Sequence, residues 1–539
     1  MMLPWRRVRA ALLLAPGLLV IVALPGFAVD LVQLRLGTIA GAGWSAEAVT
    51  LQLNLLDERH TGLLLQAQSV ALPGGFGELS ALTLSCARAQ FSTTAVSCAE
   101  GTLKTQSSLL GQQHIQLTFS YQLDSGRIDT ALRNIHAYDG TLALTAGLSD
   151  TRWQIDATGT ALSLPAVTRQ LVAAGIALPV VAGSAGLDIT ARLSGVSSQL
   201  HEADVDVRLL AEEVSDAAGS VAAENLDVSL HATVKAIAAG MRVVLDISGR
   251  QGALYIDPVY LEMPPQPLHI NARFDWLSAG QQLLLQSLSY RHPGSVLVEG
   301  HGHFSLAADA PIGDLQLELR QANFPSLYDT YLRPWLHGSM LADLDTAGEL
   351  SGTLYWEQGK LSRVSLDPLN LSVNDREGRF GLNAVNGRVR WSDTAVPARS
   401  ELAWSSGSVF QVALGATDLV IDAGHDYVRL AQPVAIPVLD GVLQVADFQL
   451  QTGADATWRW QFDGLLEPVS LSQLSLALGW PELAGKLSGV IPDVHYDNGD
   501  LEVGGVLLVR AFEGEVTLRN LKLQQPFGLV PRLQVNARA

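Results

Sequence analysis

The sequence predicts an all-β protein: a long, twisted antiparallel sheet with a few short helices and an N-terminal transmembrane helix. Apolar and polar residues alternate with a period of two along most of the chain, as in strands with one apolar and one wet face. Gly, Asn and Asp turn signals separate these runs. Hydrophobic residues make up 48% of the chain and charged residues 16%, below the roughly 25% usual in soluble domains.

The transmembrane helix is predicted from a charge pattern at the N-terminus. A basic segment, residues 1–9, precedes an uncharged stretch, residues 10–29, that ends at Asp30. At about 1.5 Å per residue this stretch reaches roughly 30 Å, the thickness of the hydrocarbon core of a bilayer. By the positive-inside rule the N-terminus lies in the cytoplasm and the body outside it. The alternative is a cleaved signal peptide ending at residues 25–28. We favour the anchor because the stretch exceeds a usual h-region of roughly 7–15 residues, and both alternatives export the body.

Two cysteines agree with export. Cys86 and Cys98 end two β-like runs, and the spacing lets them face each other across a hairpin. A pair without a third cysteine, in an exported chain, favours a disulfide over two buried free thiols. A zinc site is disfavoured because no histidine lies between or near them.

Length and charge exclude several classes of protein. The chain has 539 residues, too many for one core unless the fold is elongated. Its net charge of −18 disfavours binding of nucleic acid and direct electrostatic docking on anionic headgroups. A mean hydropathy of +0.22 cannot come from one short N-terminal segment, so the body itself carries apolar surface that something must cover. Because apolar residues are spread throughout, disorder is also disfavoured.

The body is predicted to be an antiparallel meander with one apolar face. Residues 204–209, 268–275 and 314–320 alternate strictly between apolar and polar. Such a face can close into a barrel, pack against a second sheet, or curl into a trough that holds something apolar. For any single inward residue, ordinary core packing and lipid contact are both open. Our candidates for the inward face are Ile270, Phe274, Leu315, Leu317 and Leu319.

Three short helices are predicted, each with a Ser or Pro entry: residues 163–171, 323–328 and 468–474. A small glycine-rich strand follows each of them, which suggests a loose repeat of a plug helix and a stretch of meander. The predicted segments are residues 30–160, an N-terminal β region with the cysteine hairpin; residues 161–340 and 341–480, two groove segments; and residues 481–539, a C-terminal β repeat.

No constellation for catalysis is evident. A G-x-S-x-G elbow is absent, and the glycines near Lys486 do not have the spacing of a phosphate loop. His301 and His303 share a strand face and His292 lies upstream, but no cysteine or converging carboxylate completes a metal site beyond Glu299. We therefore expect no enzyme activity, no metal and no cofactor.

An aromatic group lies within the second predicted helix and just beyond it. Tyr328, Tyr331 and Trp335 have the three- and four-residue spacing that places side chains on one helix face. We interpret this face as a core-facing stripe. The alternatives are a plug in a groove and a contact for lipid headgroups.

The C-terminal region resembles a known family. Residues 483–492 and 498–505, then 513–523 and 526–528, look like the C-terminal repeat of YdbH-like proteins, a branch of the AsmA-like envelope proteins. The resemblance implies a protein anchored in the inner membrane of a Gram-negative bacterium, with its bulk in the periplasm. Its sheet would curl into an open groove with an apolar interior, along which phospholipid acyl chains move. Related chains continue beyond the strand that ends this sequence at residues 535–539, so we expect a truncated distal end.

Two functions follow as hypotheses. The first is transfer of phospholipid between inner and outer membrane by partitioning of acyl chains, where each buried methylene contributes about 0.8 kcal/mol. Its partners would be phospholipid acyl chains, the inner membrane through residues 10–29, and an outer-membrane or periplasmic protein at the distal end. The second is a non-catalytic scaffold that assists outer-membrane protein assembly by offering sheet edges. An envelope hydrolase is disfavoured.

Overall fold

The structure is a computed structural model. It describes residues 30–41, 44–57, 60–71, 77–173, 175–305, 312–394, 396–452, 458–497, 500–511, 514–524 and 532–538. The predicted basic segment and transmembrane helix, residues 1–29, lie outside this part of the chain, as do residues 498–499, 513 and 526–528 of the C-terminal resemblance. Within the described residues, no helix has the length and apolar character needed to span a membrane.

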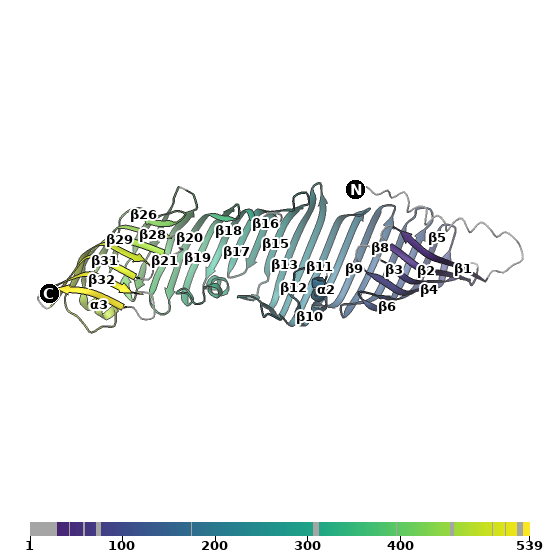
Figure 1. Cartoon of the computed structure of the whole chain (residues 1–539), viewed down its shortest axis with the longest axis horizontal. Helices are drawn as coiled ribbons and strands as arrows, with labels where there is room; N and C mark the ends of the chain where they lie inside the picture. The colour runs from purple at the N-terminus through teal and green to yellow at the C-terminus, as the bar shows by residue number, and fades with distance from the viewer. Residues whose placement is uncertain are drawn as a thin grey trace. The chain divides into compact units, whose positions relative to one another are not determined.

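The protein is all-β, as predicted, with 75% strand and 6% helix (Figure 1). Neighbouring strands pair antiparallel at every junction whose register is described. The chain divides into two compact units, one ending at Tyr255 and one beginning at Ile256. The segment boundaries proposed from the sequence stay a prediction.

Unit 1 is a meander of long strands with one helix between β9 and β10. Along the sheet each strand pairs with the strand that follows it, because short turns connect them. Its elements are β1 (Leu31–Gly41), β2 (Trp44–Leu55), β3 (His60–Ala71), β4 (Glu78–Phe91), β5 (Ala95–Ser107), β6 (Gly111–Gln122), β7 (Ile128–Ala137), β8 (Gly140–Ser149), β9 (Arg152–Ser163), α2 (Leu164–Ala173), β10 (Val181–Val196), β11 (Gln199–Asp216), β12 (Val221–Ile237) and β13 (Gly240–Ile256).

Unit 2 begins as the same kind of meander and breaks into shorter strands after β21. There β21 pairs with both β22 and β23, and β28 pairs with both β26 and β27. Its first elements are β14 (Val259–Glu262), β15 (Leu268–Leu277), β16 (Gln282–His292), β17 (Val296–Ser305), β18 (Ile312–Phe324), η4 (Tyr328–Leu332), η5 (Arg333–Leu336), β19 (Leu344–Glu357), β20 (Lys360–Asp375), β21 (Phe380–Ser392) and β22 (Ala398–Trp404). The remaining elements are β23 (Ser406–Val409), β24 (Val412–Leu414), β25 (Thr417–Ala423), β26 (Tyr427–Leu430), β27 (Val434–Val438), β28 (Gly441–Thr452), β29 (Trp458–Ser470), α3 (Leu471–Ala477), β30 (Lys486–Asp497), β31 (Asp500–Ala511), β32 (Gly514–Gln524) and β33 (Arg532–Arg538).

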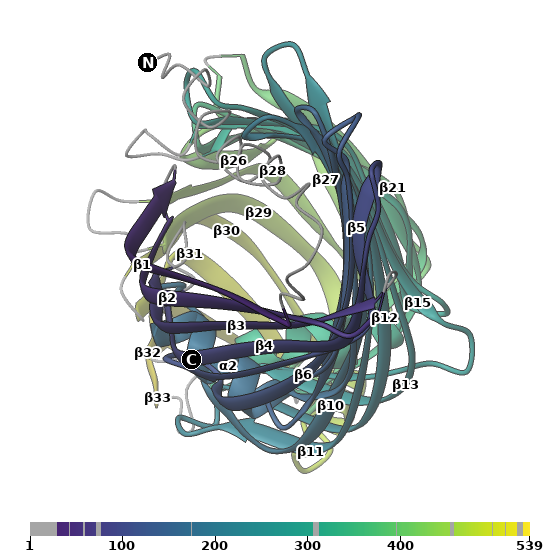
Figure 2. The same cartoon turned by 90° about the vertical axis from the view of Figure 1, so that its right-hand side faces the viewer.

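Bulges interrupt the register of many strands and bend them. Gly348 of β19 has φ +105°, and Asn370 on the neighbouring β20 has φ +50°. A side chain at Gly348 would meet the Leu371 Cα at 2.7 Å, so only glycine fits beside the bulged partner strand. Such bulges kink a strand and increase its twist. In unit 1, whose strands also carry register shifts, Figure 2 shows several strands curving along their length.

The three predicted helices are found, with different boundaries or geometry. The first is α2, beginning at Leu164. The second does not begin at residue 323, because β18 runs to Phe324; residues 326–327 are α-helical and continue into a π-helix, η4, and a 3₁₀-helix, η5. The third begins at Leu471 and not at residue 468. Ser470 stays extended as its N-cap because its backbone N–H donates to Asp440 Oδ1 (2.6 Å) and fixes the end of β29.

Candidate functional site: the apolar faces of the two units

Apolar side chains of unit 2 form continuous rows across β15 to β21. Directly paired residues of antiparallel strands point to the same face of a sheet, so the register defines each row. We call the surface made by these rows the apolar face of unit 2. The rows are Ile270–Tyr290–Val298–Leu319–Gly352–Leu366–Val389, Ala272–Leu288–Gly300–Leu317–Leu354–Val364–Trp391, and Phe274–Leu285–Gly302–Leu315–Trp356–Leu361.

The five residues predicted to face inward all lie on this face. Ile270 and Leu319 belong to the first row, Leu317 to the second, and Phe274 and Leu315 to the third. Every residue of the three rows is half-buried and none is fully buried. A second layer packed on the rows would bury the central ones, as it does in a sandwich. The structure therefore brings the predicted residues together, while their contact with lipid stays a prediction.

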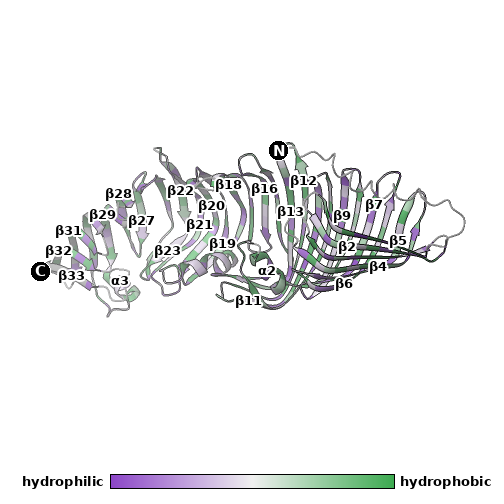
Figure 3. Cartoon of the chain, turned by 45° about the vertical axis from the view of Figure 1, so that its right-hand side comes forward, coloured by the Kyte–Doolittle hydropathy of each residue, from purple (hydrophilic) through white to green (hydrophobic). Residues whose placement is uncertain are grey.

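Leucines lie over glycines within the rows. Leu317 of β18 pairs with Gly300 of β17, and a Cβ added at Gly300 would come 2.6 Å from Leu317 Cδ2. Leu366 stands in the same relation to Gly352, at 2.9 Å. These glycines let the neighbouring leucine side chains lie flat, which gives a low, continuous hydrocarbon floor. Figure 3 shows the corresponding alternation of hydrophobic and hydrophilic residues along the strands.

The opposite face of the same strands is polar and charged. Arg320 Nε donates to Glu299 Oε2 across β17 and β18 (2.8 Å), and Arg388 pairs with Asp367 across β20 and β21. These side chains are half-exposed to exposed, which is where ion pairs remain hydrated. The sheet of unit 2 is thus amphipathic across its thickness, with a water-compatible side behind the hydrocarbon rows.

One end of the apolar face is covered by the η4–η5 segment, residues 328–336. Tyr331 Oη lies 2.7 Å from His292 Nδ1 and is also hydrogen-bonded to Tyr290 Oη. Burial raises the pKa of Tyr331 and of Tyr290, so both stay protonated at neutral pH. Tyr328 is 2% exposed. The fully buried apolar residues of this end are Leu268, Val296, Ala322 and Leu344.

The predicted common face of Tyr328, Tyr331 and Trp335 is not found. Tyr328 and Tyr331 turn toward the sheet, whereas Trp335 is 68% exposed. The prediction assumed α-helical spacing, but the segment changes from a π-helix to a 3₁₀-helix at Arg333, which rotates the later side chains away.

Unit 1 also has an apolar face. One row of paired residues crosses β1 to β12, and Cys86 of the disulfide belongs to it. The row is Val32–Leu53–Leu63–Cys86–Gly101–Leu117–Leu132–Leu144–Ala157–Ala191–Val205–Ala232. Helix α2 packs against β9 and β10 of the same unit, where Leu162 and Leu187 are buried.

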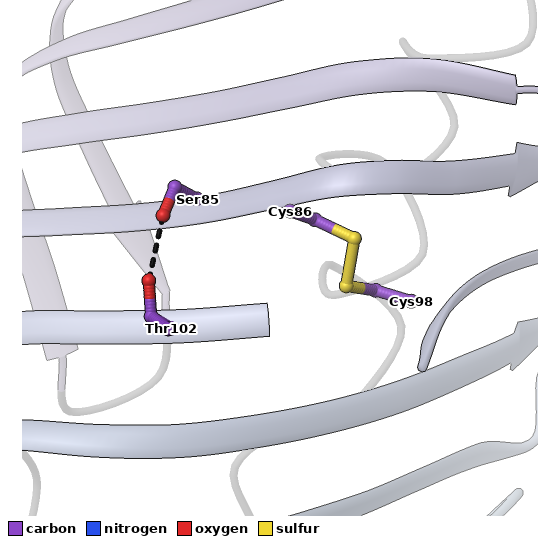
Figure 4. Close-up of a disulfide and its surroundings, with 4 residues drawn as sticks. All are labelled: Ser85, Cys86, Cys98 and Thr102. Carbon is purple, nitrogen blue, oxygen red and sulfur yellow. Dashed lines mark hydrogen bonds between the residues drawn. A yellow bond between two sulfur atoms is a disulfide. The ribbon is translucent and has the colours of Figure 1, made fainter. Parts of the chain in front are cut away.

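The predicted disulfide is present between Cys86 and Cys98, with their Cα atoms 6.2 Å apart. The two residues do not face each other directly, because Cys86 pairs with Gly101 and Cys98 pairs with Phe119 of β6. The bridge therefore runs diagonally (Figure 4). A Cβ at Gly101 would lie 3.1 Å from Cys98 Sγ, so the glycine makes room for the sulfur. Ser85 and Thr102 share a hydrogen bond of 2.7 Å beside it.

The histidines considered as metal ligands are separated. His292 is buried against Tyr331 on the apolar face, whereas His301 and His303 lie on the polar face of β17, paired with Gln316 and Asp314. Among the described residues, the group with ligand atoms close together is Asp204, Asp206 and His231 on β11 and β12. Sequence reasoning missed it because His231 is distant in sequence. These side chains are half to fully exposed, and His231 Nδ1 pairs with Asp206 Oδ1 at 2.9 Å.

An aromatic stack on β28 to β30 was also missed. The Trp460 ring lies parallel to the Tyr496 ring, with centroids 5.6 Å apart, and stacks on Phe462 at 6.0 Å. Phe448 pairs with Phe462 in the ladder, and its ring also lies near Trp460. Trp460 and Phe462 stand two residues apart on β29 and therefore share a face, but their cross-strand partners depend on a register that sequence does not supply.

Comparison with known proteins identifies no relative: no protein-family model matches the chain, and neither does any curated protein.

Proposed function

We propose that this chain is a lipid-transfer protein that carries phospholipid acyl chains along its apolar sheet faces. It is non-catalytic, anchored in the inner membrane through residues 10–29, with its bulk in the periplasm of a Gram-negative bacterium. It serves transport between inner and outer membrane. The observation that carries the proposal is the apolar face of unit 2, whose rows cross β15 to β21 without one fully buried side chain.

Half-buried hydrocarbon in water is unfavourable, by roughly 25 cal/mol for each Å² left exposed. A soluble domain avoids large contiguous patches of this kind, so such a surface normally has an apolar occupant. An acyl chain fits because the rows contain leucine, isoleucine, valine and glycine, with no charged side chain among them. Sliding along a uniform row exchanges one hydrocarbon contact for another and costs little, while leaving the row costs much.

The proposal is tested by site-specific photo-crosslinking in cells. A photo-reactive residue at Leu317 lies in the middle of the second row, and one at the adjacent Gln316 lies on the polar face opposite Tyr355. The two positions belong to the same strand and have similar burial, so they differ in the face that they sample. We expect phospholipid attached at Leu317 and none at Gln316.

Two results would count against the proposal. Crosslinks from Leu317 to protein alone would mean that a partner covers the face, which favours the scaffold hypothesis. Equal phospholipid labelling at both positions would mean nonspecific contact with membrane. A second matched pair, Phe274 and Arg273 on β15, checks that either outcome is not peculiar to one strand.

A further inference from the structure

Two tyrosines hold the η4–η5 segment on the sheet of unit 2, and they make different kinds of contact. Tyr328 Oη donates to the Leu341 carbonyl (2.7 Å) and accepts from the Leu344 backbone N–H (3.1 Å). These partners are in the chain that leads from the segment into β19. Tyr331 instead contacts side chains of β16, with its ring edge-on to His292 (5.8 Å between centroids) and to Tyr290 (6.3 Å). Tyr331 therefore ties the segment to β16, and η4 also packs against β14.

His292 is placed where it tolerates a charge poorly. The residue is 8% exposed, and its ladder partner on β17 is Val296. Strand β15 begins with the buried Leu268, one position beyond the His269–Arg291 pair. The imidazole contacts the neutral hydroxyl of Tyr331 from η4, which is hydrogen-bonded in turn to the Tyr290 hydroxyl of the strand that carries His292. Of the charged residues of the turn, Arg333 pairs with Asp329 at 3.9 Å and with Asp343 at 3.4 Å.

The protonation state of His292 determines whether its Nδ1 accepts or donates in the hydrogen bond with Tyr331. A neutral Nδ1 can accept a hydrogen bond from the Tyr331 hydroxyl, whereas an imidazolium can only donate and carries a charge among apolar groups. Burial accordingly lowers the pKa of His292 below 6.5. Because the pKa of His292 is lowered in the closed arrangement, the closed arrangement has its full stability above pH 6.5. That stability is lost as the pH falls through the lowered pKa, where an open arrangement that hydrates His292 is favoured.

We infer that the η4–η5 segment is a pH-sensitive lid, closed over the end of the apolar face by the Tyr331 contact with His292 and Tyr290. The buried Val296 and Ala322 belong to the same row as His292, so opening adds this row to the apolar face. That the exposed surface then receives an acyl chain rests on the proposed function. The existence of the lid does not.

The test measures the lid itself, without lipid. Spin labels at Trp335→Cys on the segment and at Lys360→Cys, an exposed position at the start of β20, report their separation by pulsed electron resonance at pH 7.5 and pH 5. The native cysteines are bonded to each other, so only the introduced thiols take the label. We expect one narrow distance distribution at pH 7.5 and a second, displaced population at pH 5.

Two variants test whether the pH-dependent change in distance comes from the contact between His292 and Tyr331. His292→Gln keeps a hydrogen-bonding side chain that does not titrate, so its distribution should stay narrow at both pH values. Tyr331→Phe removes the hydroxyl and should show the displaced population already at pH 7.5. The inference is overturned if the parent protein gives the same distribution at both pH values, or if His292→Gln shows the same pH response as the parent.

A second measurement, on the photo-reactive Leu317 variant, separates this inference from the proposed function. Photo-crosslinking at Leu317 reports on lipid at the centre of the face, far along the strand from the lid contact. A pH-dependent distance with no lipid at Leu317 would support the lid and count against lipid transfer. Lipid at Leu317 with a pH-independent distance would do the reverse.

Discussion

Leu317 on β18 lies across Gly300 on β17, so close that a methyl group at Gly300 would come 2.6 Å from Leu317 Cδ2 and 3.0 Å from the Gln316 carbonyl oxygen. The glycine is therefore part of the hydrocarbon floor, although it contributes no side chain. Its place is taken by the leucine of the neighbouring strand. Within the described rows, Gly302 and Leu315 repeat the arrangement.

The first prediction is that Gly300→Ala destabilises unit 2 by about 1–3 kcal/mol, because the added methyl overpacks a filled site and displaces Leu317. The measurement is the free energy of unfolding from urea denaturation. Gly186→Ala on β10 is the matched control, since a Cβ there meets nothing within 4 Å. An unchanged stability for Gly300→Ala would show that Leu317 can move aside freely.

The disulfide gives the second prediction. Replacing Cys86 and Cys98 together by serine should lower the free energy of unfolding by roughly 2–4 kcal/mol, the usual contribution of a bridge that closes a short loop. Reduction of the parent protein should lower the urea midpoint to the same extent. The double variant should not respond to reductant, which separates the bridge from other effects of the reagent.

Much of the fold followed from local pattern. The alternation at residues 268–275 and 314–320 predicted which side chains share a face, and the structure agrees because the side-chain period of a strand is fixed by covalent geometry. The pairing of Cys86 with Cys98 followed from the cysteine count and the predicted export of the chain. Both inferences needed information from one strand or one hairpin.

What failed depends on partners that are distant in sequence. The turn after β18 passes from α-helical residues 326–327 into the π-helix η4, where Tyr331 contacts His292, a residue of β16. The Asp206–His231 pair and the Trp460–Tyr496 stack lie on different strands, whose register is set by bulges and tertiary packing. The alternation within one strand carries no information about contacts with other strands. It therefore predicted which side chains share a face of the sheet, but not which side chains of different strands meet.

The third prediction concerns an ion pair at the end of β20. The Asp375 carboxylate is buried and accepts three hydrogen bonds from Arg379, two from the guanidinium at 2.7 and 2.9 Å and one from the backbone N–H. These bonds, the guanidinium first, hold the pKa of Asp375 below its usual range. Arg379→Ala should therefore lower the urea midpoint clearly more than Arg388→Ala, whose exposed pair with Asp367 contributes little.

The pH dependence of this contribution has a definite sign. Because the pKa of Asp375 is lowered on folding, the stabilisation is fully present above pH 3.8 and is lost as the pH falls through the lowered folded-state value. The difference in urea midpoint between the parent and Arg379→Ala should shrink below pH 3.8. A difference that grows on acidification would contradict the assignment of the pair.

The aromatic stack on β29 and β30 supplies a prediction that rests on the proposed function. Trp460 is half-buried between Phe462 and Tyr496, on a face where the ladder also places Val494 and Val503. If acyl chains lie on that face, brominated phospholipid should quench the fluorescence of Trp460 because bromine acts only at close range. The quenched fraction of the fluorescence should fall in Trp460→Phe. It should stay unchanged in Trp335→Phe, since Trp335 is 68% exposed on the η4–η5 segment and does not belong to the stack. Equal losses in the two variants would mean that the brominated chains do not distinguish the stack from an exposed tryptophan, and the face would then have no specific occupant.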